Sequence, residues 1–280
     1  MNNMKTVILL GALTGLFLFV GGAAGGRGGM IIALIFAGIM NIAAYWFSDK
    51  IVLKTYGAQP LSQTEAPGIH NMVEELCQNA GIPKPKVYVL SEESPNAFAT
   101  GRDPKHGAVA LSRGIIKLMN REELKGVIAH ELSHIRHRDT LIQTAAATIG
   151  GAIMFLAYQM RWFAFLGGGS DDEDGGGILG LLVMAVLAPI AAMIIQMAIS
   201  RSREYKADLG AAELTHNPEG LASSLEKLGH YTKRIPMKAT RQTAHLFIVS
   251  PLSGKGLLSI FSTHPPLEKR VARLREMRYS

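Results

Sequence analysis

Residues 130 to 134 read His-Glu-Leu-Ser-His, and residues of these types at this spacing can bind a metal ion and hydrolyse a bond. On an α-helix His130 and His134 lie one turn apart, so both imidazoles can point at one ion and supply half of a tetrahedral zinc site. Glu131 projects toward the same coordination position, where its carboxylate can take a proton from a water and pass it to a leaving amine. The pentapeptide therefore predicts metal-assisted hydrolysis.

The surrounding residues predict the helix that this chemistry requires. Asn120 can cap a helix together with Glu123 three residues later, and basic residues at 136–138 complement the opposite end of the helix dipole. Apolar residues recur at helical spacing between these ends: Leu124, Val127, Ile128, Leu132 and Ile135. The simpler alternative is that both histidines are ordinary polar residues on an amphipathic helix, with a solvated glutamate between them.

A catalytic zinc needs a third protein ligand and one open position for water. Glu204 in the polar segment 200–208 is the candidate, and Asp208, one helical turn later, can accept the second ring N–H of a ligating histidine. The same spacing also fits an exposed helix in which these acids pair with Arg201, Arg203 and Lys206. The residues alone do not decide between the two interpretations.

The chain resembles the M48 family of integral membrane metallopeptidases through four motifs. His130-Glu131-x-x-His134 is followed by Ser202-Arg-Glu-Tyr-x-Ala-Asp208, and the segments 94–101 and 262–266 also fit the family. The resemblance covers nearly the whole chain, with no departure at a motif residue. It implies one zinc ion per chain bound by His130, His134 and Glu204, with Glu131 as the general base of a zincin-type (gluzincin) domain.

The same resemblance points to three residues that would contact a substrate. Asn96 would bind an extended peptide through its side-chain amide, and the strand-like run around Val109 would pair with the peptide along an open edge. His264 would stabilise an oxyanion or a substrate carbonyl. The alternatives are an ordinary hairpin with Asn96 in its turn, and a His264 that caps the helix entered through a Pro-Pro pair.

Four uncharged runs are each long enough to cross a hydrocarbon core of about 30 Å. They predict membrane spans at about 6–24, 30–48, 140–160 and 178–200. The chain then divides into an N-terminal membrane hairpin (1–48), a cytoplasmic catalytic region (49–139), a second membrane hairpin (140–200) and a cytoplasmic region that completes the zinc site (201–280). The first run could instead be a secretory signal, but a second run follows at once and favours an uncleaved hairpin.

Basic residues predict how the chain is oriented in the membrane. Residues 49–139 hold 12 Lys and Arg and residues 201–280 hold 14, whereas the acidic loop 162–177 holds none. The positive-inside rule then puts both termini and both basic regions in the cytoplasm. His134 precedes the third span and Glu204 follows the fourth, so an antiparallel hairpin would join the two halves of the site at the cytoplasmic surface. Together with the resemblance, this predicts a multi-pass protein of the bacterial plasma membrane.

The remaining segments predict a fold that is mainly α with a small β-sheet. Helices are expected at 65–79, 112–119 and 217–228, and strands at 86–90, near Phe98 and near Val109. The basic region 232–255 is expected to be a loop and is a candidate flap, and the arginines near the C-terminus, Arg270 among them, are expected on a solvated helix face. Cys77 as the single cysteine suits a reducing compartment. The net charge of +7 fits anionic headgroups of a lipid bilayer better than nucleic acid.

Together these features predict a membrane-embedded zinc endopeptidase. The resemblance implies that its substrates are misfolded or damaged membrane proteins cut at the cytoplasmic face, which would serve membrane protein quality control and the stress response. One alternative is a non-catalytic membrane scaffold with a structural metal, in which His264 would supply the fourth ligand. Another is a protease that processes prenylated peptides, although four spans enclose little volume for such a substrate.

Overall fold

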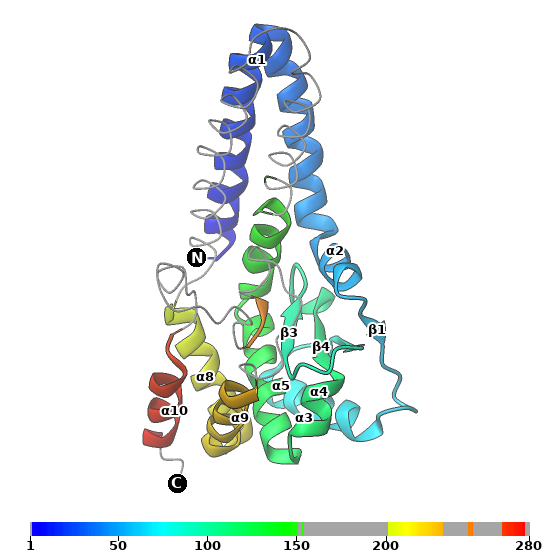
Figure 1. Ribbon diagram of the computed structural model, residues 1–280, viewed down its shortest axis with the longest axis vertical. Helices are drawn as coiled ribbons and strands as arrows, with labels where there is room; N and C mark the ends of the chain where they lie inside the picture. The colour runs from blue at the N-terminus through cyan, green and yellow to red at the C-terminus, as the bar shows by residue number, and fades with distance from the viewer. Residues whose placement is uncertain (1, 151–152, 154–200, 232–245, 249–264, 278–280) are drawn as a thin grey trace, which may run out of the picture.

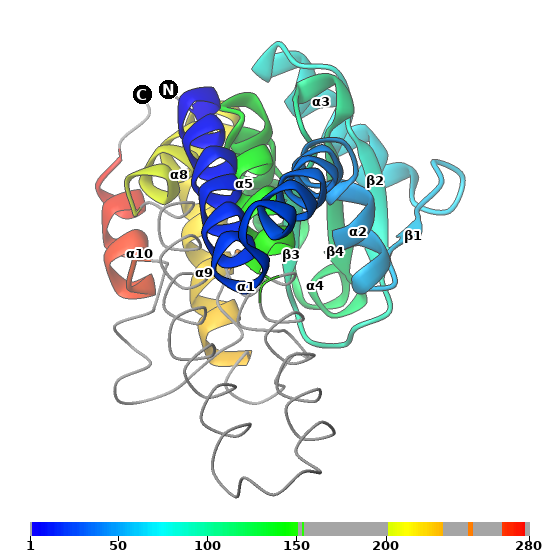
Figure 2. The same cartoon turned by 90° about the horizontal axis from the view of Figure 1, so that it is seen from above.

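A computed structural model describes residues 2–150, 153, 201–231, 246–248 and 265–277 of the chain. A helical hairpin, α1 (Asn2–Trp46), stands away from a lower body of helices and a small sheet (Figure 1). In this body α5 (Arg121–Arg136) lies centrally, with the sheet on one side and α8 (Arg201–Thr215) and α9 (Pro218–Tyr231) on the other (Figures 1 and 2). The described part of the chain is mainly helical with one mixed sheet, as the sequence predicted.

The helix α1 folds back on itself near Gly26. The φ angle of Gly26 is +54°, in the left-handed region that glycine adopts without strain. Side chains join the two arms: the Asn41 amide donates to the Thr14 hydroxyl at 3.0 Å. The rings of Phe17 and Phe36 meet edge to face, with centroids 5.2 Å apart. The two arms therefore pack as an antiparallel pair.

One arm of α1, Gly26–Trp46, is long and apolar enough to cross a membrane, and Thr6–Phe19 in the other arm is a shorter apolar helix. Large apolar side chains on these arms are exposed, as a lipid-facing surface requires; Phe19 is 74% exposed and Ile32 is 71% exposed. The predicted third span is described as a helix up to residue 150, and the predicted fourth span, 178–200, lies outside the described residues. Four membrane spans therefore stay a prediction.

The sheet contains the strands β1 (Gln59–Pro60), β2 (Lys86–Leu90), β3 (Ala97–Thr100) and β4 (Ala108–Ser112), in the order β1-β2-β4-β3. The strands β2 and β4 are parallel, with Val87 opposite Val109, whereas β1 and β3 are antiparallel to their neighbours. The strand β4 is thus paired on both sides. The prediction that the strand around Val109 offers an open edge is wrong, because β3 covers that edge.

Helices cover both faces of the sheet. Val109 and Leu111 pack with α5 and with α3 (Pro67–Ala80) in the larger core, whereas Phe98 and Ala110 pack against α2 (Ser48–Thr55) in the smaller one. The chain also forms a 3-10 helix, η1 (Pro104–His106), and the helices α4 (Arg113–Leu118) and α10 (Leu267–Glu276). The predicted helices at 65–79, 112–119 and 217–228 correspond to α3, α4 and α9, and the predicted strands are confirmed. The sheet and α9 hold α5 from opposite sides.

Candidate metal centre

The helix α5 presents both histidines of the pentapeptide. It begins with the predicted capping box, in which the Asn120 Oδ1 accepts the N–H of Glu123 and the Glu123 carboxylate accepts the N–H of Asn120, each at 2.9 Å. His130 and His134 lie one turn apart near the other end and are almost fully buried. The buried histidines exclude the alternative of a solvated polar face.

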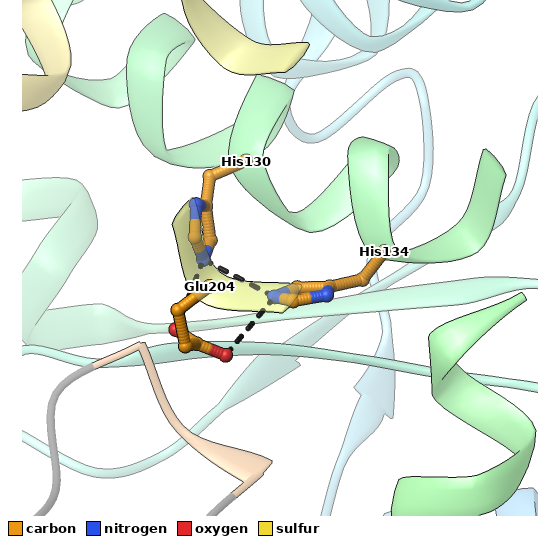
Figure 3. Close-up of side chains that lie close together, drawn as sticks. All are labelled: His130, His134 and Glu204. Carbon is orange, nitrogen blue, oxygen red and sulfur yellow. Dashed lines mark hydrogen bonds and ion pairs between the residues drawn. The ribbon is translucent and has the colours of Figure 1, made fainter. Parts of the chain in front are cut away.

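Glu204, in the first turn of α8, meets both histidines (Figure 3). The Nε2 atoms of His130 and His134 lie 3.2 Å apart, and the nearest Glu204 oxygens lie 3.8 Å and 3.6 Å from them. Ligands held about 2.0–2.1 Å from a tetrahedral zinc ion lie about 3.3 Å from one another. The first of these oxygens is Oε2 and the second is Oε1, and one ligand atom from each of the three residues lies within 4.8 Å of the other two, close enough for the three to share one ion.

A carboxylate holds the other nitrogen of each imidazole. Asp208 Oδ1 lies 3.0 Å from His130 Nδ1, and Asp139 Oδ2 lies 3.3 Å from His134 Nδ1. A proton on each Nδ1 leaves two Nε2 lone pairs that face each other and the Glu204 carboxylate, and such an arrangement needs a cation between them. Asp208 has the position predicted for it. The role of Asp139 was not predicted from the sequence, although this residue lies directly before the predicted third span.

The charges buried around the three ligands also fit a divalent cation. Four carboxylates and two guanidinium groups surround the imidazoles, all of them buried: Glu131, Glu204, Asp139, Asp208, Arg203 and Arg270. When all are ionised, two negative charges are left over. Buried charge must be compensated, and an ion such as Zn²⁺ supplies the missing charge.

A close helix crossing brings Glu204 to the histidines. Gly210 on α8 lies directly on Ser133 of α5, and a Cβ built at residue 210 would collide with the Ser133 hydroxyl and lie 3.1 Å from its Cβ. The glycine leaves room for the Ser133 side chain between α8 and α5. Gly210 therefore supports the close crossing of the two helices less than two turns from Glu204.

Comparison with known proteins agrees with this geometry. The model of peptidase family M48 matches residues 63–278. The chain belongs to this family. It is 55% identical over 276 residues to a Protease HtpX homolog of Desulforapulum autotrophicum, covering 98% of this chain and 89% of that one. It is 52% identical to the homolog of Syntrophobacter fumaroxidans, with 99% of each chain covered, and 50% identical to that of Pyrococcus furiosus, with 98% and 95% covered.

A solved structure shares the fold of this M48 peptidase. The crystal structure of S. mikatae Ste24p superposes with a TM-score of 0.54 at 18% sequence identity and covers 98% of this chain. The chain spans 65% of the length of that protein, and at this identity the likeness shows the fold alone. Membership of the M48 family makes the chain a metal-dependent peptidase.

Burial and neighbouring charges shift the pKa values in the M48 site. Burial raises the pKa of Glu131 to about 7, and the charge of Glu204 acts in the same direction. Burial lowers the pKa of His130 to about 4, although its bond to Asp208 opposes this shift. Burial would lower the pKa of His134 as well, but the carboxylates of Asp139 and Glu204 outweigh it and raise that pKa to about 9. Without a metal, His134 is therefore protonated at neutral pH.

The structure bears differently on the three residues predicted to contact a substrate. Asn96 is buried just before β3, where its N–H donates to the Ser112 hydroxyl at 2.9 Å and its Oδ1 accepts the Ala97 N–H at 3.0 Å. Its role in binding a substrate stays a prediction. Val109 is buried within β4 and has no free strand edge. His264 lies outside the described residues.

Arg270 is a second residue whose position differs from its predicted one. It was expected on a solvated face of the C-terminal helix, but its side chain is completely buried beside Asp208. The apolar neighbours Val271 and Leu274 share the buried face of α10, and the spacing of these three residues is the only signal in the sequence. A buried arginine at the edge of an apolar helix face cannot be told from an exposed one without the fold.

Proposed function

We propose that the chain is a zinc endopeptidase whose site lies at the cytoplasmic surface of a bacterial plasma membrane. The convergence of His130, His134 and Glu204 next to Glu131 carries this proposal. Two histidines and a carboxylate are a ligand set of catalytic zinc sites, which keep a fourth position for water. The family membership supports peptide-bond hydrolysis as the reaction.

Glu131 acts as the proton carrier of the proposed reaction. A divalent cation bound by the three ligands would polarise the scissile carbonyl. The Glu131 carboxylate accepts a proton from the attacking water and then delivers it to the leaving amine nitrogen, so that one water is consumed per bond cleaved. Burial suits both steps, because it raises the pKa of Glu131 above that of an ordinary glutamate and so makes the carboxylate a better proton acceptor.

The strand β3 is the better candidate for pairing with a substrate than β4. It forms one of the two outer edges of the described sheet, the edge that lies beside α5 (Figure 2). The Ala99 N–H donates to the Glu131 carboxylate, which places this strand next to the proposed base. At the other end of β3 the Ala97 carbonyl accepts the Ile248 N–H at 3.1 Å, so the chain itself pairs there. An extended peptide would therefore meet the sheet around Ala99.

Residues at the end of α1 support a site close to the membrane surface. Tyr45, Trp46 and Phe47 are exposed together where the apolar arm ends, as aromatic residues are at a bilayer interface. The Arg102 guanidinium lies 4.6 Å above the Trp46 ring. Proteins of the same membrane with misfolded cytoplasmic segments would reach such a site directly, and they are the proposed substrates.

The deciding experiment compares the parent chain with Glu131→Gln, both purified in detergent and loaded with zinc. Glu213→Gln is the matched control, because it makes the same change on the exposed face of α8. We expect equal zinc content in all three proteins, measured by atomic absorption, and cleavage of casein by all except Glu131→Gln. Zinc in all three without cleavage by any would overturn the proposal in favour of a structural metal.

A further inference from the structure

The C-terminal helix α10 reaches the metal centre through one side chain, Arg270. Its Nε donates to Asp208 Oδ2 at 2.9 Å and its Nη2 donates to Asp208 Oδ1 at 2.7 Å, a two-pronged contact that fixes the plane of the carboxylate. The third nitrogen, Nη1, donates to the carbonyl of Ile248 at 3.1 Å. The guanidinium is completely buried, so these acceptors replace its water.

The same carboxylate oxygen serves Arg270 and His130. Asp208 Oδ1 lies 2.7 Å from Arg270 Nη2 and 3.0 Å from His130 Nδ1. By holding Asp208, Arg270 fixes the oxygen that keeps the proton on Nδ1 and turns the Nε2 of His130 toward the ligand position. Losing the guanidinium would free Asp208 to rotate, and His130 would lose its orientation.

Arg270 also lies beside one oxygen of Glu204. Its Nη1 is 3.6 Å from Glu204 Oε2, whereas Glu204 Oε1 is the oxygen nearest His134. Oε2 is also the oxygen that pairs with His130 Nε2, at 3.8 Å. The guanidinium therefore lies beside the carboxylate that faces both histidines and helps to balance its charge.

We propose that Arg270 is a positioning residue of the metal centre and that it makes metal binding and the docking of α10 depend on each other. The proposal rests on the proposed function only in that the ion is the one bound by His130, His134 and Glu204. When α10 is docked, Arg270 orients His130 and balances the buried carboxylates. Binding of the ion must then stabilise the docked helix by the same factor, since coupling between two sites is reciprocal.

The helix α10 also makes contacts away from the metal centre, so its packing can be weakened without changing the metal ligands. Arg275 pairs with Glu219 at 2.9 Å and with Glu226 at 2.8 Å, both on α9. The Arg273 guanidinium lies 4.2 Å above the ring of Tyr205 on α8. Arg275 is exposed and touches no residue of the metal centre. The variant Arg275→Ala therefore loosens α10 without changing a ligand or its orientation.

The first test measures zinc affinity by competition with a chromophoric chelator. Loss of a residue that orients a ligand typically lowers metal affinity about 10–100-fold, and we expect this loss in Arg270→Met. Arg270→Lys keeps the charge but not the two-pronged geometry, so its affinity should fall between those of Arg270→Met and the parent. Arg275→Ala should weaken zinc binding by a smaller factor, whereas Lys117→Ala on α4, which removes an exposed pair with Glu93, should leave it unchanged.

The second test measures hydrogen exchange of the α10 amides in the parent chain with and without zinc. By reciprocity, zinc should slow their exchange about 10–100-fold beyond any slowing in α3, which also packs against α5 and α8 but sends no side chain to Asp208. This readout holds even where Arg270→Met does not fold. Unchanged zinc affinity in folded Arg270→Met, or equal α10 exchange with and without zinc, would overturn the inference. A parent chain that binds no zinc would instead overturn the proposed function, which makes the two failures distinguishable.

Discussion

Gly126 marks the closest approach of α5 to α9, and replacing it with alanine would force the two helices apart. A Cβ at residue 126 would lie 2.6 Å from the backbone nitrogen of Leu221 and 2.9 Å from its Cα. Ordinary van der Waals contact of a Cβ begins at 3.4 Å, so the nearest approach is 0.8 Å too short. The blocking atoms belong to the backbone, and no change of rotamer can relieve the overlap.

The expected cost follows from the rigidity of this crossing. Overpacking a close-packed interior destabilises a protein by about 1–3 kcal/mol. Because the neighbours of residue 126 are rigid backbone atoms, we expect a destabilisation of about 3 kcal/mol in Gly126→Ala. The higher helix propensity of alanine offsets about 1 kcal/mol of it. The net loss in the free energy of unfolding is about 2 kcal/mol, which lowers Tm by roughly 4–8 °C for a domain of 150–250 residues.

Thermal unfolding in detergent, followed by differential scanning fluorimetry, measures this loss. The control is Gly68→Ala on α3, where no described atom lies within 4 Å of the added Cβ; its Tm should equal or exceed that of the parent. Gly220→Ala affects the same crossing from the α9 side, with a Cβ 2.6 Å from the Glu122 carbonyl oxygen. The double variant should therefore lose less than the sum of the two single losses. A Gly126→Ala variant that melts at or above the parent Tm would refute the argument.

Three further outcomes are expected. Asn120→Ala removes the capping box of α5 and should lower the free energy of unfolding by about 1 kcal/mol, measured by the same fluorimetry; an unchanged Tm would mean that the box contributes nothing. Cys77 is buried and desolvation raises its pKa to about 12, so the native protein should not react with a thiol reagent at pH 8 until it is denatured; rapid labelling would contradict the packing of α3. Zinc binding should release about one proton or more at pH 7, because His134 holds a proton below its raised pKa of about 9 and must lose it to coordinate. The affinity for zinc should thus rise with pH up to about 9. Calorimetry in buffers of different ionisation enthalpy would count the released protons. A release of zero protons would contradict a protonated His134 in the metal-free site.

Local signals predicted the elements that carry the chemistry. The capping residues and the apolar spacing identified α5 because helix ends and faces depend on residues within a few positions of one another. Glu204 and Asp208 were ambiguous for the same reason: four-residue spacing fits both a ligand helix and an exposed ion-pair helix. The family resemblance favoured the first interpretation, and the buried contacts of both residues with His130 agree with it.

Contacts between residues far apart in the chain could not be predicted from the sequence. The run around Val109 has the composition of a strand, but nothing in it reveals that β3 returns to cover its edge. Asp139 and Arg270 are ordinary charged residues until the fold places them beside the two histidines. A charged side chain is buried only when its partner is present, and these partners come from other helices.

The residues of the metal centre lie on helices that the ribosome synthesises at different times. His130 and Arg270 are 140 positions apart in the chain. At about 5–20 residues per second, a ribosome needs roughly 7–28 s to pass from the first to the second. During that interval the nascent chain has its His-Glu-x-x-His helix but lacks the arginine that orients it. A metal centre built in this way gains its proposed orienting arginine only once α10 has been synthesised.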